Sequence, residues 1–188
     1  MAGTGPGRWL GLMAAGLAVV VVACIVVVRL FVGWFVVIPQ NGMYPGIPAG
    51  TFIFERFHPY ADVRQIARGD VVAFLRVENG QSYKYIWRVV GLPGETVTVD
   101  ADALSVNGSK AVRDKLRSQA GADIYRESLG GAVYEVALGP KLPPEIPRSV
   151  TVTMADDELF VMGDNRHGAI DSRTFGPIPF RSIVARKW

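Results

Sequence analysis

The chain has 188 residues, of which 49% are hydrophobic, and its 20 basic and 17 acidic residues give a formal net charge of +3. This length accommodates one domain of ordinary size and a short anchor. The basic residues form no block and no stripe with aromatic residues, which argues against a nucleic-acid-binding protein. The single cysteine, Cys24, excludes an intrachain disulfide.

The N-terminal region contains one long apolar run. Residues 1–9 form a Gly-rich tail that we expect to be frayed. Residues 10–28 are uncharged and rich in Val and Leu, and a helix of this length crosses the roughly 30 Å apolar core of a bilayer. We therefore predict a single transmembrane helix. Residues 29–38 are predicted to form an apolar collar at the lipid headgroups, with Trp34 in the interface and Arg29 extending toward water.

A cleavable signal peptide and a lipidated cysteine are the alternatives to a retained membrane span. A cleavable signal peptide has a shorter apolar stretch and a small-x-small ending, and neither is found here. The stretch before Cys24 resembles a lipoprotein processing site, but a lipidated cysteine is normally followed by a polar linker, whereas here the apolar run continues through Val28. Arg8 and Arg29 flank the span about equally, so charge alone does not set its orientation.

From residue 46 onward, short strands alternate with Gly- and Pro-containing turns, which predicts an all-β domain over residues 39–188. The expected strands cover residues 51–57, 71–77, 83–90, 95–99, 104–106, 150–154, 158–162 and 182–186. Asn79 and Gly80 indicate a tight hairpin between two of them. Residues 110–148 have more charge, Gly and Pro and little periodicity, so we expect an inserted surface excursion with one helical turn near residues 113–119.

The segment from Ile38 to Pro45 reads I-P-Q-N-G-M-Y-P and joins the anchor to the β domain. Two prolines fix the backbone and Gly42 supplies freedom between them, which predicts a stiff, tightly turned strap. Such a strap is suited to presenting a side chain or a backbone edge to a peptide at a membrane surface, although Gly42 itself carries no side chain.

A second polar segment, residues 163–176, reads G-D-N-R-H-G-A-I-D-S-R-T-F-G and alternates acids with arginines. The ion pairs expected to pin this loop are Asp164–Arg166 and Asp171–Arg173, with Arg88 as a possible third partner. The alternative is a pair of free carboxylates that perform acid–base chemistry in a cleft.

Four segments resemble motifs of the type I signal peptidase family. Residues 38–45 resemble its I-P-S-x-S-M-x-P, residues 69–74 its G-D-x-V-x-F, residues 85–95 its Y-I-K-R-V-x-G-x-P-G-D/E, and residues 163–176 its G-D-N-R-x-x-S-x-D-S-R-x-x-G. They occur in the family's order after one membrane span. Together they cover the domain from end to end apart from the excursion.

The resemblance implies a membrane-bound serine endopeptidase that removes signal peptides from exported precursors. It places an antiparallel, signal-peptidase-like β domain outside the cytoplasmic (inner) membrane. The family uses a Ser nucleophile and a Lys base, whose pKa falls when burial in an apolar pocket disfavours the charged amine. It implies no metal and no cofactor.

When the family's functional residues are aligned with this sequence, four positions carry residues other than those that perform this chemistry in the family. The nucleophilic Ser falls on Gly42, the Lys base on Trp87, the Ser linked to oxyanion stabilisation on Gln40, and the Ser that orients the Lys on Ala169. The positions that match the family are Met43, Pro45, Arg88, Gly91, Pro93, Gly94, Gly163, Asp164, Asn165, Arg166, Asp171, Ser172, Arg173 and Gly176.

The first function hypothesis is a pseudoenzyme, which binds exported-precursor or pilin-like peptides by strand addition without cleaving them. It would serve as an accessory in secretion or surface assembly. The expected groove residues are Gln40, Asn41, Gly42, Met43, Tyr44 and Trp87. Trp87 either enlarges the apolar floor of that groove or fills the void beside Gly42 and Ala169.

The alternative is an active signal peptidase, or a conjugation-type relative, that works through a non-standard nucleophile. Ser82 and Ser172 are the nearest candidates, and His167 lies close to Ser172 in sequence. Residues so close on one loop seldom adopt the geometry of a catalytic triad. A purely structural anchor in an export complex is a third, weaker hypothesis.

Overall fold

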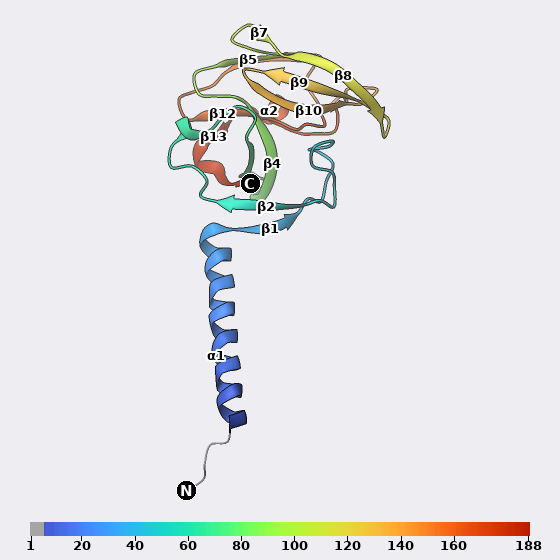
Figure 1. Ribbon diagram of the computed structural model, residues 1–188. Coiled ribbons are helices and arrows are strands. Elements are labelled where there is room, and N and C mark those ends of the chain that lie inside the picture. The colour runs from blue at the N-terminus through green and yellow to red at the C-terminus, as the bar shows by residue number, and fades with distance from the viewer. Residues whose placement is uncertain (1–5) are drawn as a thin grey trace.

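The computed structural model describes residues 6–188, and an apolar helix extends from a β-rich body as a stalk (Figure 1). This helix, α1, spans Pro6–Val27 and is followed by a π-helical turn over Val28–Val32. The prediction that residues 6–9 belong to a frayed tail is therefore wrong, because a proline is well tolerated in the first turn of a helix. Residues 1–5 of the predicted tail lie outside the described part of the chain. The stretch Trp9–Leu30 has a mean hydropathy of 2.9 and is long enough to cross a membrane.

Of the residues predicted as an interfacial collar, residues 29–32 belong to the π-helical turn and residues 33–37 form a strand of the main sheet. Strand β1 (Gly33–Val37) pairs along its whole length with β2 (Phe52–Phe57), from Gly33 opposite Arg56 to Val37 opposite Phe52. The collar prediction missed this because the apolar run continues from helix into strand without a polar break. Both strands lie at the end of the domain nearest α1 (Figure 1).

The main sheet has seven strands in the order β1-β2-β14-β3-β4-β12-β13, and its pairs are antiparallel. Its remaining strands are β3 (Val71–Glu78), β4 (Gln81–Gly91), β12 (Glu158–Met162), β13 (Ile178–Pro179) and β14 (Ile183–Lys187). Short helical turns cover Val63–Gln65, Ser172–Phe175 (α2) and Phe180–Ser182. The predicted hairpin joins β3 to β4, and both of its turn residues, Asn79 and Gly80, have positive φ as such a turn requires.

The predicted surface excursion is a three-stranded antiparallel sheet. It consists of β8 (Val112–Gln119), β9 (Ala122–Leu129) and β10 (Ala132–Leu138), in the order β10-β9-β8. The helical turn predicted near residues 113–119 is wrong. Those residues carry charges on most positions of an exposed strand, so they show no alternation of apolar and polar residues, and cross-strand pairs such as Lys115–Asp123 use the charges instead.

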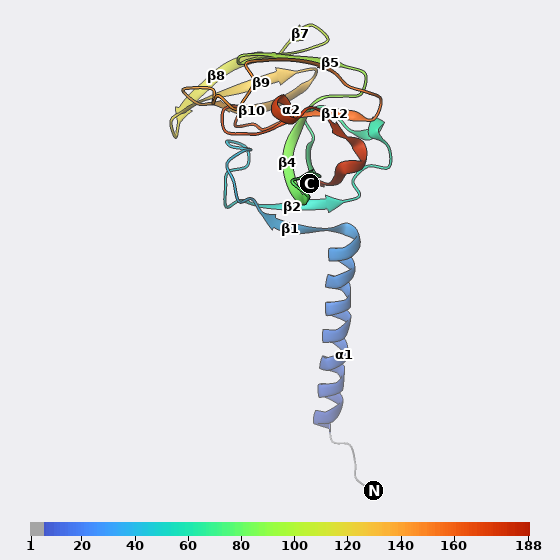
Figure 2. The same cartoon turned by 180° about the vertical axis from the view of Figure 1, so that it is seen from behind.

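A four-stranded sheet completes the body, with strands β5 (Thr96–Asp100), β6 (Ala103–Val106), β7 (Ser109–Lys110) and β11 (Ser149–Thr153) in the order β11-β5-β6-β7. One apolar core lies against the main sheet and includes Met43, Phe74 and Trp87, and a second forms around Val97 and Phe160. The view from behind shows the loop between β1 and β2 rising from the base of the domain toward the three-stranded sheet (Figure 2). That loop carries the strap.

Candidate functional site

The strap, residues 38–45, is held against the body by main-chain hydrogen bonds at both ends. Ile38 N donates to Thr51 O at 3.0 Å, and Gly50 N donates to Ile38 O at 2.8 Å. At the other end, Asn165 donates its main-chain N–H to Gly42 O and its side-chain amide to Asn41 O, both at 3.1 Å. The matching family residue Asn165 thus fixes the backbone of the strap at the position where the family places its nucleophile.

Gly42 and Trp87 are in close contact. A Cβ built on Gly42 would lie 2.3 Å from Cη2 and 2.4 Å from Cζ3 of the Trp87 ring, which is closer than real contacts allow. A Cβ on Gly163 would lie 2.3 Å from Ala169 Cβ and 2.6 Å from Gly42 O. Gly42, Trp87 and Ala169 are therefore brought together, and the indole fills the space beside the two small residues.

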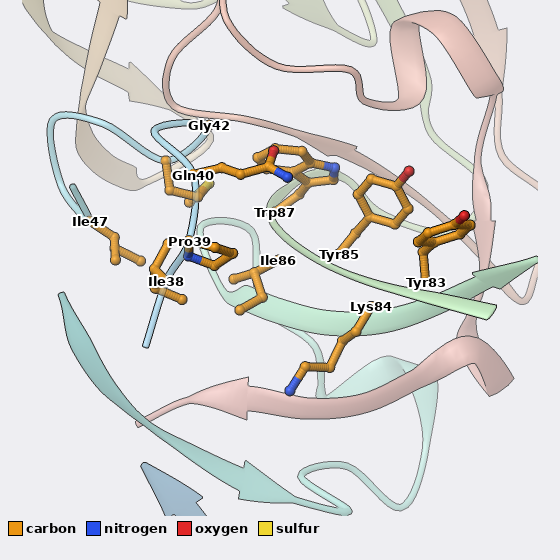
Figure 3. A pocket seen from close by; sticks show the side chains of 11 residues that line it. Ile38, Pro39, Gln40, Gly42, Ile47, Tyr83, Lys84, Tyr85, Ile86 and Trp87 are labelled. Atoms are coloured by element: carbon orange, nitrogen blue, oxygen red, sulfur yellow. The ribbon is translucent and has the colours of Figure 1, made fainter. Parts of the chain in front are cut away.

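An apolar pocket of about 160 Å³ opens beside this cluster, between the strap and β4 (Figure 3). We call it the strap pocket. Its lining residues are Ile38, Pro39, Gln40, Gly42, Met43, Ile47, Tyr83, Lys84, Tyr85, Ile86 and Trp87. Of the predicted groove residues, Gln40, Gly42, Met43 and Trp87 line it, whereas Asn41 and Tyr44 do not. Asn41 instead accepts a hydrogen bond from Ala49 N at 2.8 Å through its side-chain oxygen.

Lys84 is the one cation in the lining of this pocket, and it does not face Gly42. Its Nζ donates to Glu55 Oε2 at 2.7 Å, and the side chain points away from Trp87 (Figure 3). Glu55 is buried, and a buried carboxylate without a counter-charge would destabilise the fold. Lys84 supplies that counter-charge. Lys84 is therefore a partner of Glu55 and not a candidate base beside the strap.

Strand β4 offers a free main-chain edge next to the strap pocket. Its residues 81–87 pair with β3 on one side, whereas β12 reaches only Arg88, Val89 and Gly91 on the other. Along residues 81–87, none of the described strands covers the second edge. The unpaired N–H and C=O groups of such an edge can pair with an added strand.

The loop at residues 163–166 and the α2 region are fixed by ion pairs, but not all of the predicted ones. Arg88 donates from Nε and Nη2 to the two carboxylate oxygens of Asp164, at 2.7 and 2.6 Å. Arg173 and Asp171 pair as predicted, at 2.8 Å. The expected Asp164–Arg166 pair is wrong, because Asp164 is bound by Arg88. Both aspartates are thus paired, and the alternative of free carboxylates for acid–base chemistry is wrong.

Arg166 pairs with Glu127 of strand β9, a residue that the motifs do not include. Its Nη1 and Nη2 donate to the carboxylate at 3.0 and 2.6 Å, and Arg113 donates from Nε at 2.6 Å. Burial alone would raise the pKa of Glu127, but the two guanidinium groups lower it to about 2. Glu127 lies two residues before Leu129, and alternate residues of a strand point to the same face. This spacing is the sequence signal that could have predicted that Glu127 is buried with Leu129 in β9.

Ser172 and His167 do not form part of a triad. Ser172 is buried, and its Oγ accepts a hydrogen bond from Val161 N at 3.0 Å. The ring nitrogens of His167 lie 2.8 Å from Gly139 O and 2.7 Å from Asp102 Oδ1. Ser82 lies near the turn of the β3–β4 hairpin. The residues named as alternative nucleophiles are therefore not assembled with the histidine.

Comparison with known proteins identifies the family of this antiparallel β fold and its motif loop. A sequence model described as "Signal peptidase, peptidase S26" matches residues 10–187. The chain belongs to this family, as the motifs predict. Signal peptidase I of Bacillus caldolyticus is 29% identical over 168 residues, which are 89% of this chain and 84% of that protein.

Signal peptidase I S of Bacillus subtilis is 30% identical over 161 residues, covering 82% of this chain and 74% of that protein. A signal peptidase I from Enterococcus faecalis, known from a crystal structure, is 28% identical in sequence to this chain. The match has a TM-score of 0.38 and covers 63% of this chain and 92% of the Enterococcus chain.

Proposed function

We propose that this chain is a member of the signal peptidase family that binds extended peptides of exported precursors and does not cleave them. The observation that supports the proposal best is the contact between Gly42 and Trp87. At the position where the family has its nucleophile there is no side chain, and the position of its base holds an indole that fills the adjoining space.

Neither side chain can replace the chemistry of a Ser/Lys pair. Gly42 offers no oxygen for attack, and an indole N–H donates a hydrogen bond but does not accept a proton. Because nucleophile and base act as a unit, the loss of either removes most of the rate enhancement, and the loss of both removes little more. Hydrolysis by the family's mechanism is therefore not expected.

The features needed for peptide binding are present in the same place. The free edge of β4 supplies main-chain donors and acceptors, and the strap pocket offers an apolar recess for one side chain. A peptide added as a further strand gains affinity from the main-chain bonds and specificity from such recesses. The ligand class is an exported precursor or a pilin-like subunit, held during secretion or surface assembly.

Two features, α1 and the base of the β domain, support the membrane location that we propose. The segment Trp9–Leu30 is apolar and is not buried in the body, as a bilayer span requires. On the strands nearest to it, Phe35 and Phe52 expose 61% and 71% of their surface. We place the chain in the cytoplasmic (inner) membrane as a single-pass protein with its β domain on the extracytoplasmic side.

The experiment that tests the proposal compares cleavage of an exported precursor by two purified proteins in detergent. They are the wild type and a restored variant that carries Gly42→Ser, Trp87→Lys and Ala169→Ser. A matched control carries the same types of change outside the groove, as Gly46→Ser, Trp188→Lys and Ala155→Ser. We expect no cleavage by the wild type or the control, and cleavage by the restored variant. Cleavage by the wild type that survives Gly42→Ala would overturn the proposal in favour of a non-standard nucleophile.

Binding is measured separately, by fluorescence anisotropy of a labelled extended peptide taken from the same precursor. The variant Ile86→Trp places a large side chain in the strap pocket from a half-buried position. We expect the wild type and the control to bind the peptide and Ile86→Trp to lose at least tenfold in affinity. Equal affinity for all three proteins would show that the peptide does not use this pocket.

A further inference from the structure

A second pocket lies beside Trp87, between the strap residue Gln40 and the α2 region, with a volume of about 430 Å³. We call it the hairpin pocket, because two of its walls come from the β3–β4 hairpin and the α2 region. Its lining residues are Gln40, Arg76, Glu78, Tyr85, Trp87, Gly168, Ile170, Thr174 and Phe175. Gln40, Tyr85 and Trp87 line both pockets, so the two are neighbours along β4.

Trp87 carries a buried hydrogen-bond donor with no acceptor. The side chain is only 7% exposed, and Nε1 has no hydrogen-bond partner among the described residues. The ring edge formed by Cζ3 and Cη2 faces Gly42, whereas the nitrogen end points toward Tyr85, a wall of the hairpin pocket (Figure 3). A buried N–H without a partner is costly, and such groups are rare in folded proteins, because a protein group, an ordered water or a ligand usually satisfies them.

The charged groups of the hairpin pocket define the chemistry that fits it. Arg76 donates to Glu78 Oε1, and the Tyr85 hydroxyl donates to the same oxygen at 2.8 Å. Both of these hydrogen bonds use Oε1, so Oε2 of Glu78 remains as an acceptor. The pocket thus presents an N–H donor from Trp87 and a carboxylate acceptor from Glu78 around the aromatic rings of Tyr85 and Phe175.

A carboxamide matches this combination, because it carries one C=O acceptor and an NH₂ donor on the same plane. After a small side-chain shift that uncovers the buried Trp87 Nε1, its oxygen would accept from that N–H and its nitrogen would donate to Glu78. A carboxylate ligand has no hydrogen to donate to Glu78, whose charge is paired with Arg76, and an aliphatic side chain would leave the indole N–H unpaired.

The direction of the side chains on β4 relates the two pockets to one peptide. Tyr85 and Trp87 lie on one face of the strand, whereas Lys84 and Ile86 point to the other (Figure 3). In a peptide added along the same edge, neighbouring side chains also point to opposite faces. A peptide residue that enters the strap pocket on the side of Lys84 and Ile86 therefore places the next residue toward Trp87, which lines both pockets.

We propose that the hairpin pocket is a specificity site for an Asn or Gln side chain of the bound peptide, recognised by Trp87 Nε1 and Glu78. This inference rests on the proposed peptide-binding function and adds a sequence preference to it. Trp87 is then a binding residue and not only a filler of the space beside Gly42.

The test measures the affinity of the full-length protein in detergent for labelled extended peptides that differ at one position. That position adjoins an apolar residue chosen for the strap pocket and carries Asn, Leu or Asp. We expect the Asn peptide to bind about tenfold more tightly than the Leu and Asp peptides, the size of effect that one buried hydrogen bond to a charged or unpaired group produces. If no peptide binds, the proposed function fails. If all three bind equally, only the carboxamide inference is overturned.

Two variants separate recognition from structural support. Replacement of Trp87 by the isosteric benzothienylalanine keeps the ring and removes only the N–H, and should reduce the preference for Asn over Leu to about twofold or less. Glu78→Gln removes the charge, and should raise the affinity for the Asp peptide relative to the Asn peptide. Trp188→Phe, at the exposed C-terminus, serves as the control and should preserve the Asn preference. An Asn preference unchanged by both pocket variants would overturn the inference.

Discussion

Arg166 and Glu127 form a two-point ion pair in which both side chains are buried, 2% and 0% exposed, and which joins the motif loop to the three-stranded sheet. Arg166 Nε also donates to Gly163 O at 3.1 Å, and the next-door Asn165 holds the strap at Gly42 O. The sheet at residues 112–138 therefore braces the loop against which the strap rests. It is a structural part of the site and not a loose insertion.

The first prediction is that Glu127→Gln strongly destabilises the domain. The substitution leaves the Arg166 guanidinium buried without its counter-charge, a situation that costs about 3–5 kcal/mol. Glu135→Gln is the matched control on the same sheet, because its pair with Arg117 is about 40% exposed on both sides and is worth ~0–1 kcal/mol. Chemical denaturation in detergent measures both changes. Equal losses in the two variants would contradict a bracing role for the buried pair.

The second prediction is that the ion pairs of Glu127 make the stability of the domain depend on pH. The pKa of Glu127 is lowered from its ordinary 4.5 to about 2 in the fold, because the attraction of Arg166 and Arg113 outweighs the effect of burial. A carboxyl with a lowered pKa stabilises the fold fully above its unfolded value and loses this contribution as the pH falls toward the folded value. The wild type should therefore lose stability between pH 4.5 and about 2 more steeply than Glu127→Gln. Parallel stability curves for the two proteins over this window would argue against the pairing.

A third prediction concerns the coupling between positions 42 and 87. Gly42→Ser alone should destabilise the protein by about 1–3 kcal/mol, because its Cβ would overlap the Trp87 ring. Gly46→Ser is the matched control in the strap region, since its Cβ would meet Asp164 Oδ2 at an ordinary 3.5 Å. We expect Trp87→Lys to relieve most of the Gly42→Ser penalty, so the double variant should be more stable than the sum of the single changes predicts. Additive losses in the double-mutant cycle would show that the two positions are not in contact.

The sequence predicted the family and most of the strands outside residues 29–38 and 110–148 well, because those features rest on local patterns. Val71 to Val77 and Tyr83 to Val90 are rich in β-branched and aromatic residues and flank an Asn-Gly turn, and the hairpin forms there. The motifs likewise give the identity of Gly42 and Trp87 directly. What they do not give is the distance between them, because the two residues come from different elements and meet only through the fold.

The predictions that failed depend on partners far away in sequence. Asp164 was expected to pair with its neighbour Arg166. Asp164 instead pairs with Arg88 of strand β4, and Arg166 pairs with Glu127 of strand β9. Residues 113–119 lack apolar periodicity, because their charges pair across strands and not with a core. The helix-to-strand change at Gly33 is hidden for the opposite reason, since β1 is apolar on both faces.

The last prediction addresses how β1 lies relative to a bilayer. Trp34 is 36% exposed, and the Arg29 guanidinium lies 4.3 Å from the centre of its ring. This pairing of an aromatic ring with a cation, directly after an apolar span, is typical of residues at the lipid headgroups. In vesicles that contain lipids brominated near the headgroup, Trp34 should be quenched, so Trp34→Phe should remove a distinct part of the quenchable fluorescence.

Trp87→Phe is the control, because Trp87 is buried in the β domain and should contribute little to quenching by lipid. If Trp34→Phe leaves the quenched fraction unchanged, β1 stands clear of the bilayer. The groove would then lie farther from the membrane surface than the short connection between α1 and β1 implies. If the fraction falls as expected, the strap and the free edge of β4 are held close to the point where an exported peptide leaves the membrane.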